Sequence, residues 1–221
     1  MSRPGSSYNP AMNRRPEDGS FGSPPQSGAQ EDSLLVARVR SGDFSAMDEL
    51  VQRHYRNVFN LAFRLSGNYD DAQDIVSEAF IRVHNALPNF RGEANFTTWL
   101  YRIVKNVFLD ERKKQRVRNH ASLEEMVDLE DSLVSRQVED PNPGPEWEVE
   151  RGERADTVQK AVGTLPEAQR VMIALYHFHH RSYEEIAEVM NLPIGTVKSR
   201  LNLARLALKN KLYDTKELLE S

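Results

Sequence analysis

Apolar residues recur three or four positions apart through most of this chain, and that spacing constrains the fold more than any other feature. From Asp32 to Arg116 it predicts four successive helices, over about 33–41, 45–66, 70–87 and 97–116. No segment alternates with period two for long enough to predict a strand. We therefore expect an all-α protein whose first helical domain covers residues 32–117.

Short polar residues, glycine and proline mark where these helices begin and end. Ser45 with Asp48 forms a capping box for the second helix, and Asp70 is placed to cap the third. Gly67 and Pro88 end the second and the third helix.

The remaining chain divides by composition. Residues 1–31 are rich in Gly, Pro and Ser and predict a disordered tail. Residues 118–150 predict a flexible acidic linker, because residues 121–150 carry ten acids against Arg136 alone, a net charge of −9. The whole chain carries −4, so the rest sums to +5. A second small helical domain is expected over 151–214, before a short tail over 215–221.

Several classes of protein are excluded or disfavoured by what the sequence lacks. The chain has no cysteine, which excludes disulfides, a thiolate nucleophile and Cys-ligated metals. No apolar run is long enough to span a membrane and no signal peptide is present, so we expect a cytoplasmic protein without membrane contact. No Ser/His/Asp arrangement or Gly-rich phosphate loop is found, so neither catalysis nor a cofactor is predicted.

Residues 182–212 have the pattern of a helix-turn-helix. Ser182 and Glu185 form a capping box that opens a short helix, the segment 191–195 breaks it, and Thr196 opens a longer helix to about Leu212. In this motif the second helix enters a major groove of DNA. The inward stripe of that helix is Val197, Leu201, Ala204 and Leu208, whereas its basic face is Lys198, Asn202, Arg205 and Lys209 with Arg200 to one side. The alternative is a helical hairpin with a solvated basic face.

The segment 90–102 combines four aromatic residues, the first of them Phe90, with a basic helix start. Phe96, Trp99 and Tyr101 lie near Arg102, Lys105 and Asn106 in the sequence. Aromatic rings beside cations suit single-stranded nucleic acid, because unstacked bases need a stacking partner and phosphates need cations. The competing interpretation is that Phe96 and Trp99 belong to the core.

Two further clusters have weaker chemical meaning. Asp71, Asp74 and Glu78 share the side of the third helix away from its apolar stripe, where a solvated face or a docking surface for a basic partner is expected. His177, His179 and His180 lack the further ligands that a metal site needs, so no metal is predicted.

Five motifs in order resemble the two domains of bacterial sigma factors of the extracytoplasmic-function group. They are the segments 74–80, 90–93, 96–103, 182–187 and 195–200, within Leu35–Arg116 and Leu165–Leu212. The resemblance implies a promoter-specificity subunit of RNA polymerase, not an enzyme, acting on a specific and stress-responsive regulon. It also implies a free monomer.

The resemblance assigns three sets of residues. Binding to the clamp coiled coil of core RNA polymerase would use Asp71, Asp74, Ile75, Glu78 and Phe80. Opening of the −10 promoter element, with one base flipped into a pocket, would use Arg91, Asn95, Phe96, Trp99, Arg102, Lys105 and Asn106. Reading of the −35 element, beside the polymerase flap, would use Tyr183, Thr196, Lys198, Ser199, Arg200, Asn202 and Arg205.

Two leucines depart from the family pattern. Leu203 and Leu206 stand where the family often carries basic or charged residues, and both fall outside the inward stripe. They indicate altered packing or a partner surface. The usual partner in this group is an anti-sigma factor that masks both domains.

Two other classes of function stay open from the residues alone. A helix-turn-helix regulator that acts without polymerase would need a dimerisation element, and no heptad run provides one. A helical adaptor with solvated basic faces would have no use for the aromatic arrangement at 90–101.

Overall fold

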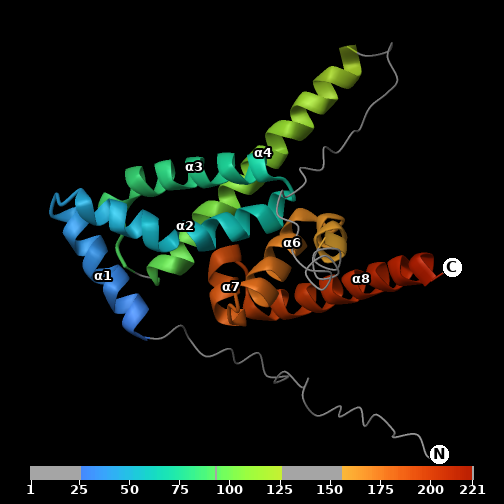
Figure 1. Cartoon of the computed structure of the whole chain (residues 1–221). Coiled ribbons are helices and arrows are strands. Elements are labelled where there is room, and N and C mark those ends of the chain that lie inside the picture. The colour runs from blue at the N-terminus through green and yellow to red at the C-terminus, as the bar shows by residue number, and fades with distance from the viewer. Residues whose placement is uncertain (1–25, 93, 126–155, 221) are drawn as a thin grey trace, which may run out of the picture.

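The computed structural model describes residues 26–92, 94–125 and 156–220, and within these ranges every regular element is helical (Figure 1). The elements are α1 (Gln26–Arg40), α2 (Ser45–Ser66), α3 (Tyr69–Ala86), η2 (Leu87–Asn89), α4 (Phe96–Glu125), a helix over 156–163, α6 (Glu167–Ile173), η3 (Ala174–Phe178), α7 (Tyr183–Met190) and α8 (Ile194–Glu220). The all-α prediction is confirmed. Residues 1–25 of the predicted tail, residues 126–150 of the predicted linker and the first five residues of the predicted second domain lie outside the described residues.

The first domain is built from α1 to α4, which pack around one apolar core. The core residues include Leu50, Val58, Leu61 and Leu65 on α2, Ile75 and Val83 on α3, and Leu100, Val104 and Val107 on α4. Figure 1 shows α3 lying along α2, with α4 crossing behind both helices and projecting beyond the domain. Burial of these core residues is what stabilises helices that have ordinary intrinsic propensity.

Helix α1 begins at Gln26, within the segment that the composition predicts to be a disordered tail. Asp32 is buried, and its Oδ1 accepts hydrogen bonds from His54 Nε2 and Arg53 Nε, both at 3.0 Å. Glu31 forms an ion pair with Arg53 as well. The composition of the segment did not predict these contacts with α2, because each joins two residues more than 20 positions apart in the chain.

Two helix starts use other caps than the sequence suggested. At α2 the side chain of Asp43, not Ser45, accepts the hydrogen bond, from the backbone N–H of Ser45 at 3.1 Å. At α3 the N-cap is Asn68, whose Oδ1 accepts from the backbone N–H groups of Asp70 and Asp71. The predicted stop at Gly67 is confirmed, since this residue has the left-handed φ of 75° that glycine adopts easily.

The second domain contains the predicted helix-turn-helix. The capping box at the start of α7 is present in both directions, with Ser182 Oγ accepting from Glu185 N–H and the Glu185 carboxylate accepting from Ser182 N–H. Asn191 then turns the chain with a φ of 53°. Val197, Leu201 and Ala204 of α8 are buried against α6 and α7 as predicted.

The two domains pack directly on each other. Helix α7 lies against α4, and both α6 and η3 contact α2 (Figure 1). Among the described residues, no helix is long and apolar enough to cross a membrane. The packing brings the helix-turn-helix beside the N-terminal half of α4, which is the segment that carries the aromatic and basic residues noted above.

Candidate functional site

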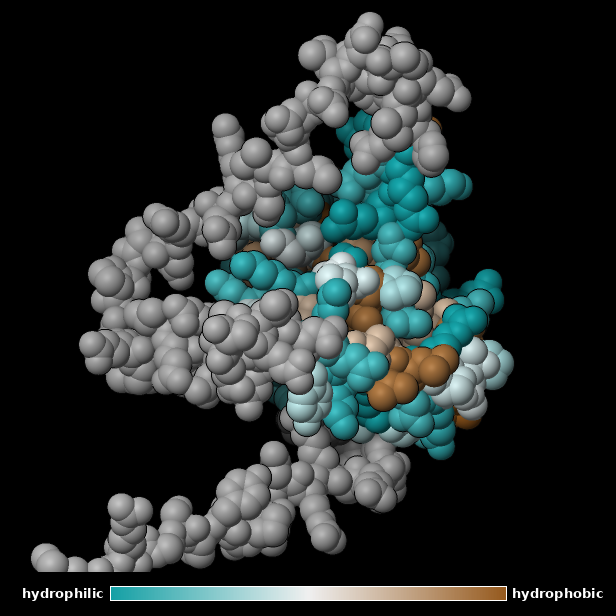
Figure 2. All heavy atoms as spheres, turned by 90° about the vertical axis from the view of Figure 1, so that its right-hand side faces the viewer, coloured by the Kyte–Doolittle hydropathy of each residue, from teal (hydrophilic) through white to brown (hydrophobic). Residues whose placement is uncertain are grey.

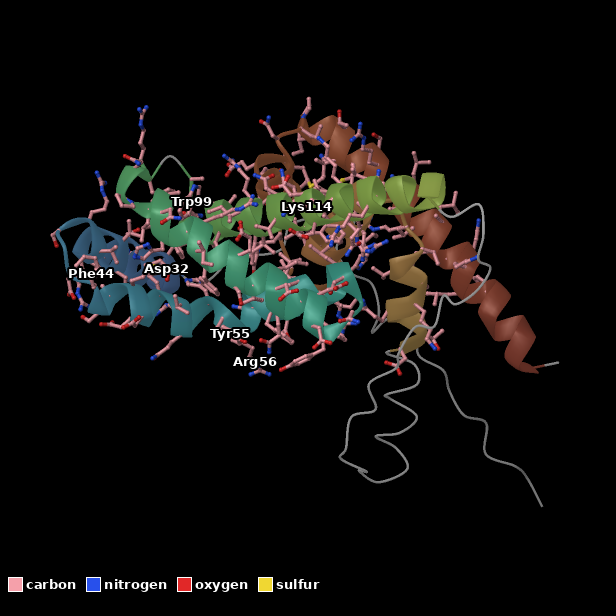
Figure 3. All side chains as sticks on the ribbon, turned by 90° about the horizontal axis from the view of Figure 1, so that it is seen from above. Asp32, Phe44, Tyr55, Arg56, Trp99 and Lys114 are labelled. Atoms are coloured by element: carbon pink, nitrogen blue, oxygen red, sulfur yellow. The ribbon has the colours of Figure 1, made fainter. Side chains whose placement is uncertain are left out.

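Three aromatic rings form a cluster where the loop after η2 meets the start of α4. The ring centroids of Phe90 and Trp99 are 4.7 Å apart, those of Phe96 and Trp99 5.8 Å, and those of Phe90 and Phe96 6.3 Å. Phe96 is buried, but Phe90 and Trp99 are only partly buried, and Figure 3 shows Trp99 near the N-terminal end of α4. We call these three residues the aromatic corner. Trp99 is therefore packed on the core and exposes part of its ring as well.

Polar residues surround the aromatic corner. Arg91, Asn95 and Asn106 are exposed, so their side chains are available to a ligand. Gly92, in the loop between them, adopts a left-handed φ of 74°. Exposed cations and amides beside aromatic faces are the groups that bind phosphates and unstacked bases.

Arg102 and Lys105 are engaged differently from the rest of the predicted set. The Arg102 guanidinium donates from Nη2 to the backbone carbonyl of Glu188 in α7, at 3.0 Å. Lys105 is only 8% exposed, and burial, aided by the neighbouring Arg102, lowers its pKa. In this arrangement Lys105 is covered, whereas Arg102 is bonded to the second domain and stays partly exposed.

The interface between the domains is held by a set of polar contacts. Gln159 donates from Nε2 to the carbonyls of Phe63 and Arg64, both at 3.2 Å, and accepts from Arg64 Nη1 at 3.0 Å. Arg170 is buried and donates to the carbonyl of Leu65 at 2.7 Å across the interface. These contacts supply partners to carbonyls in the last turn of α2, where the Phe63 carbonyl also accepts from the backbone N–H of Gly67.

Tyr101 and His179 form a further contact across the domains. The Tyr101 hydroxyl lies 3.1 Å from His179 Nδ1, and the Arg181 guanidinium stands 5.3 Å from the centre of the Tyr101 ring. Burial lowers the pKa of His179 to about 4, and the charges of Arg181, His180 and Arg64 act in the same direction. The His179 ring is therefore neutral at neutral pH, which suits a position among cations.

The five α3 residues that the family resemblance assigned to polymerase binding divide between the core and the surface. Ile75 is buried in the core, whereas Asp74 is exposed and Asp71 partly so. Both aspartates line a hollow of about 230 Å³ between α3 and α4 that also contains Arg112 and Arg118. The fifth member, Phe80, stacks on Tyr55 with ring centroids 6.5 Å apart.

Sequence reasoning missed a row of aromatic residues that continues this surface along α2. Tyr55 stacks on Phe59, and Phe59 meets Tyr69 edge-on at 5.3 Å. Tyr55 and Tyr69 are 42% and 51% exposed, and Ile81 on the adjoining helix is 57% exposed. Figure 3 places Tyr55 and Arg56 together on the outer side of α2. The four-residue spacing of Tyr55, Phe59 and Phe63 was the available signal, but it fits a core stripe equally well.

On α8 most of the residues assigned to reading the −35 element are exposed to solvent. Lys198, Ser199, Arg200 and Asn202 are exposed, and Thr196 and Arg205 are partly buried. The Lys198 ammonium stands 5.5 Å from the centre of the ring of Tyr183, which brings the α7 member of the set beside the α8 members. Leu203 and Leu206 are 61% and 56% exposed, so the structure assigns them to the surface rather than to altered core packing.

No grouping of three or more His, Asp or Glu side chains that could hold a metal is found in the described parts of the chain. The site therefore consists of an aromatic corner on one domain, an acidic and aromatic face on α2 and α3, and a basic face on α8.

Comparisons with protein-family models match both domains. The model described as sigma-70 region 2 matches residues 50–118, and the model described as sigma-70, region 4 matches residues 155–208. These two ranges contain the aromatic corner and the helix-turn-helix respectively.

Curated relatives match over most of the chain. RNA polymerase sigma-H factor of Pseudomonas aeruginosa is 37% identical over 83% of this chain and 94% of its own length. ECF RNA polymerase sigma factor SigW of Bacillus subtilis is 32% identical over 81% and 95%. ECF RNA polymerase sigma-E factor of Escherichia coli is 37% identical over 81% and 93%.

Solved structures match the fold as well. CnrH in complex with the cytosolic domain of CnrY has a TM-score of 0.61 at 25% identity, covering 83% of this chain and 98% of that one. The sigma factor RpoE in complex with the anti-sigma factor NepR, from Bartonella quintana, has a TM-score of 0.51 at 22% identity, covering 86% and 98%.

Proposed function

The chain belongs to the sigma-70 family of RNA polymerase sigma factors, in the ECF group, and directs transcription initiation; we propose how its two domains divide that work. The first domain binds core RNA polymerase and opens the −10 element. The second domain reads the −35 element. We place the protein in the cytoplasm, where its polymerase and promoters are, and assign it the role of specificity factor without catalysis of its own.

The aromatic corner carries the assignment of −10 opening. Its half-buried Trp99 stacks on Phe90, so the indole is held rigid while part of its face stays accessible. A rigid aromatic face lowers the cost of unstacking a base, which is a few kcal/mol per base. Asn95 and Asn106 are exposed nearby and can bond to base edges, while Arg91 is placed for a phosphate.

The exposed face of α8 supports assignment of −35 reading to the second domain. Lys198, Arg200 and Asn202 project from the N-terminal half of α8, the part of a recognition helix that contacts base edges. Core binding is assigned to the first domain. The exposed Asp74 offers charge to a helical partner surface, and the stacked rings of Tyr55, Phe59 and Phe80 offer apolar area.

Promoter binding requires the domains to separate. In the closed arrangement Arg102 is bonded to Glu188 of α7 and Lys105 is buried, so two residues assigned to the −10 element are engaged within the protein. We expect polymerase to separate the domains by holding each at its own site, and a partner such as an anti-sigma factor to act on the same equilibrium.

In vitro transcription with core polymerase and genomic fragments tests this assignment. The protein with core polymerase should give specific transcripts and an open bubble, and the Trp99→Ala variant should retain core binding but open promoters at least about tenfold less, since base stacking contributes about 1–3 kcal/mol. Phe44→Ala, at a residue 74% exposed and remote from the corner, is the control. A tight specific footprint by the protein without polymerase would instead favour a regulator that acts alone.

A further inference from the structure

An open apolar groove runs along the C-terminal half of α8, away from the interface between the domains. It has a volume of about 500 Å³ and is lined by His177, Arg205, Leu208, Lys209, Leu212 and Tyr213. Tyr213 is 58% exposed at its edge, and Leu206 on the same side is 56% exposed. Figure 2 shows hydrophobic residues exposed among hydrophilic ones on the side of the molecule from which α8 projects in Figure 1.

Two cations line this groove. Arg205 and Lys209 lie one turn apart on α8, and within the described ranges their charged groups contact aromatic and imidazole rings. Arg205 and Lys209 lie over aromatic rings at 4.3 Å from the centre of Tyr176 and 5.6 Å from that of Tyr213. The surface thus fits a ligand that alternates acidic and apolar side chains.

Residues 144–150 of this chain have that composition. The sequence runs Gly-Pro-Glu-Trp-Glu-Val-Glu, so Trp147 and Val149 alternate with three glutamates. The 30 residues of 126–155 can span about 100 Å when extended, whereas α8 from 194 to 213 is about 30 Å long. A segment tethered in this way also has a high effective concentration at the groove.

We propose that residues 144–150 bind in the α8 groove in the free protein, with the Trp147 indole against Leu208 and Tyr213 and the glutamates beside Arg205 and Lys209. The segment then occupies part of the face that DNA would use, so it weakens binding of the second domain to a duplex until polymerase displaces it. Only this consequence for DNA rests on the proposed function.

Fluorescence of Trp147 tests the binding itself. The chain contains two tryptophans, so the Trp99→Phe variant of the full chain leaves Trp147 as its single reporter. In low salt its emission should be blue-shifted and protected from acrylamide, and 0.5 M NaCl should reverse part of the effect. Adding Lys209→Glu and Tyr213→Ala should make Trp147 solvent-accessible, with circular dichroism checking that α8 stays helical.

A pair of charge-matched variants separates docking from general electrostatics. Changing Glu146, Glu148 and Glu150 to Gln should expose Trp147 and raise affinity for a 30-base-pair duplex of mixed sequence about threefold or more, since three weak exposed ion pairs are removed together. Changing Asp128 and Asp131 to Asn with Glu130 to Gln makes the same change in net charge elsewhere in the linker. It should leave Trp147 protected and raise affinity less.

Four outcomes would overturn the proposal. One is a Trp147 that is solvent-accessible in the parent chain, and another is protection that survives the Lys209→Glu and Tyr213→Ala changes. Protection that disappears on tenfold dilution would identify a second copy of the chain as the occupant. If core polymerase alone protects Trp147, the groove belongs to the polymerase. None of these results bears on whether the protein directs transcription, which the transcription assay decides separately.

Discussion

Ser182 is the residue on which the turn into α7 depends. Its hydroxyl accepts from the Glu185 N–H at 3.2 Å, and its own N–H donates to the Glu185 carboxylate at 2.9 Å. Glu185 also forms an ion pair with Arg181, which stacks over Tyr101 of the first domain. The cap therefore connects the helix-turn-helix to the interface between the domains.

Ser182→Ala should lower the free energy of unfolding by about 1 kcal/mol, the usual effect of removing a helix N-cap. Urea unfolding followed by circular dichroism measures the difference. Ser77→Ala, on the exposed side of α3, is the matched control and should change stability little. Equal losses of stability in the two variants would show that the cap does not stabilise the domain.

At this scale the sequence predicts those features whose partners lie within a few positions. The Ser182 cap and the stop at Gly67 were predicted because cap and target are neighbours. The capping box predicted at Ser45 and Asp48 was wrong: the N-cap of α2 is Phe44, which has no side-chain cap, and Asp43 accepts from the Ser45 N–H instead. Asp32 and His54 were missed because their bond joins two helices.

Helices α3 and α8 present charged faces of opposite sign, and each face is expected to serve one partner. Asp74 on α3 is exposed, and the Glu78 carboxylate forms an ion pair with Arg82 at 2.8 Å. Lys198 and Arg200 on α8 are exposed. Because the two faces lie on different helices, substitutions can separate their effects.

Lys198→Ala with Arg200→Ala should reduce discrimination between −35 sequences by about 1–3 kcal/mol for each side chain that reads a base edge, the role assigned to both. Competition between promoter variants in the holoenzyme measures this. Affinity for core polymerase, measured in the same preparation, should not change. A parallel fall in core affinity would contradict the assignment.

Asp74→Asn with Glu78→Gln should instead weaken binding to core polymerase and leave promoter discrimination unchanged. Removing two charges from the α3 face weakens association with core polymerase by several-fold in low salt, and the difference should shrink as salt screens the interaction. Promoter discrimination by the holoenzyme that still forms should be unchanged. Gln73→Ala, one position away on the same helix, serves as the control, and an equal effect there would refute the assignment.

Element order and amphipathic stripes were predictable because they are periodic in the sequence, and α2, α3, α7 and the inward stripe of α8 were all placed correctly. The ends of α4 and α8 were not. The predicted fourth helix stops at Arg116, whereas α4 continues to Glu125. Apolar periodicity ends where the helix leaves the core. The pattern therefore predicts the part of a helix that packs on the core and not its full length.

The closed arrangement of the two domains is a property of the whole molecule that the sequence did not predict. Its contacts join residues about 80 to 105 positions apart, such as Tyr101 with His179 and Arg170 with Leu65. An arginine such as Arg102 looks the same in the sequence whether its side chain contacts DNA or another domain. No local pattern distinguishes the two roles.

Acid should open this arrangement. The pKa of His179 is about 4 in the closed form, below the value of about 6.5 for an exposed imidazole. The open form therefore binds a proton more readily, so the contribution of His179 to closure is complete above about pH 6.5 and is lost as the pH falls toward 4. Between pH 7.5 and 5.5 the closed-to-open ratio should fall about tenfold.

Energy transfer between dyes on introduced cysteines measures the opening. Arg56→Cys on α2 and Asn210→Cys on α8 are exposed positions, and the chain has no cysteine of its own to interfere. Transfer should fall as the pH is lowered. In a His179→Gln background the ring that takes up the proton is gone, and a pH response of undiminished size there would contradict this account.

The contact between Arg102 and Glu188 also has a consequence for protein synthesis. Its two residues are separated by 86 positions, so the ribosome completes α4 well before it reaches α7. At about 5–20 residues per second the delay is roughly 4–17 s. During that interval the nascent first domain presents the surface of α4 that the finished molecule covers, and each new chain is briefly open before it first closes.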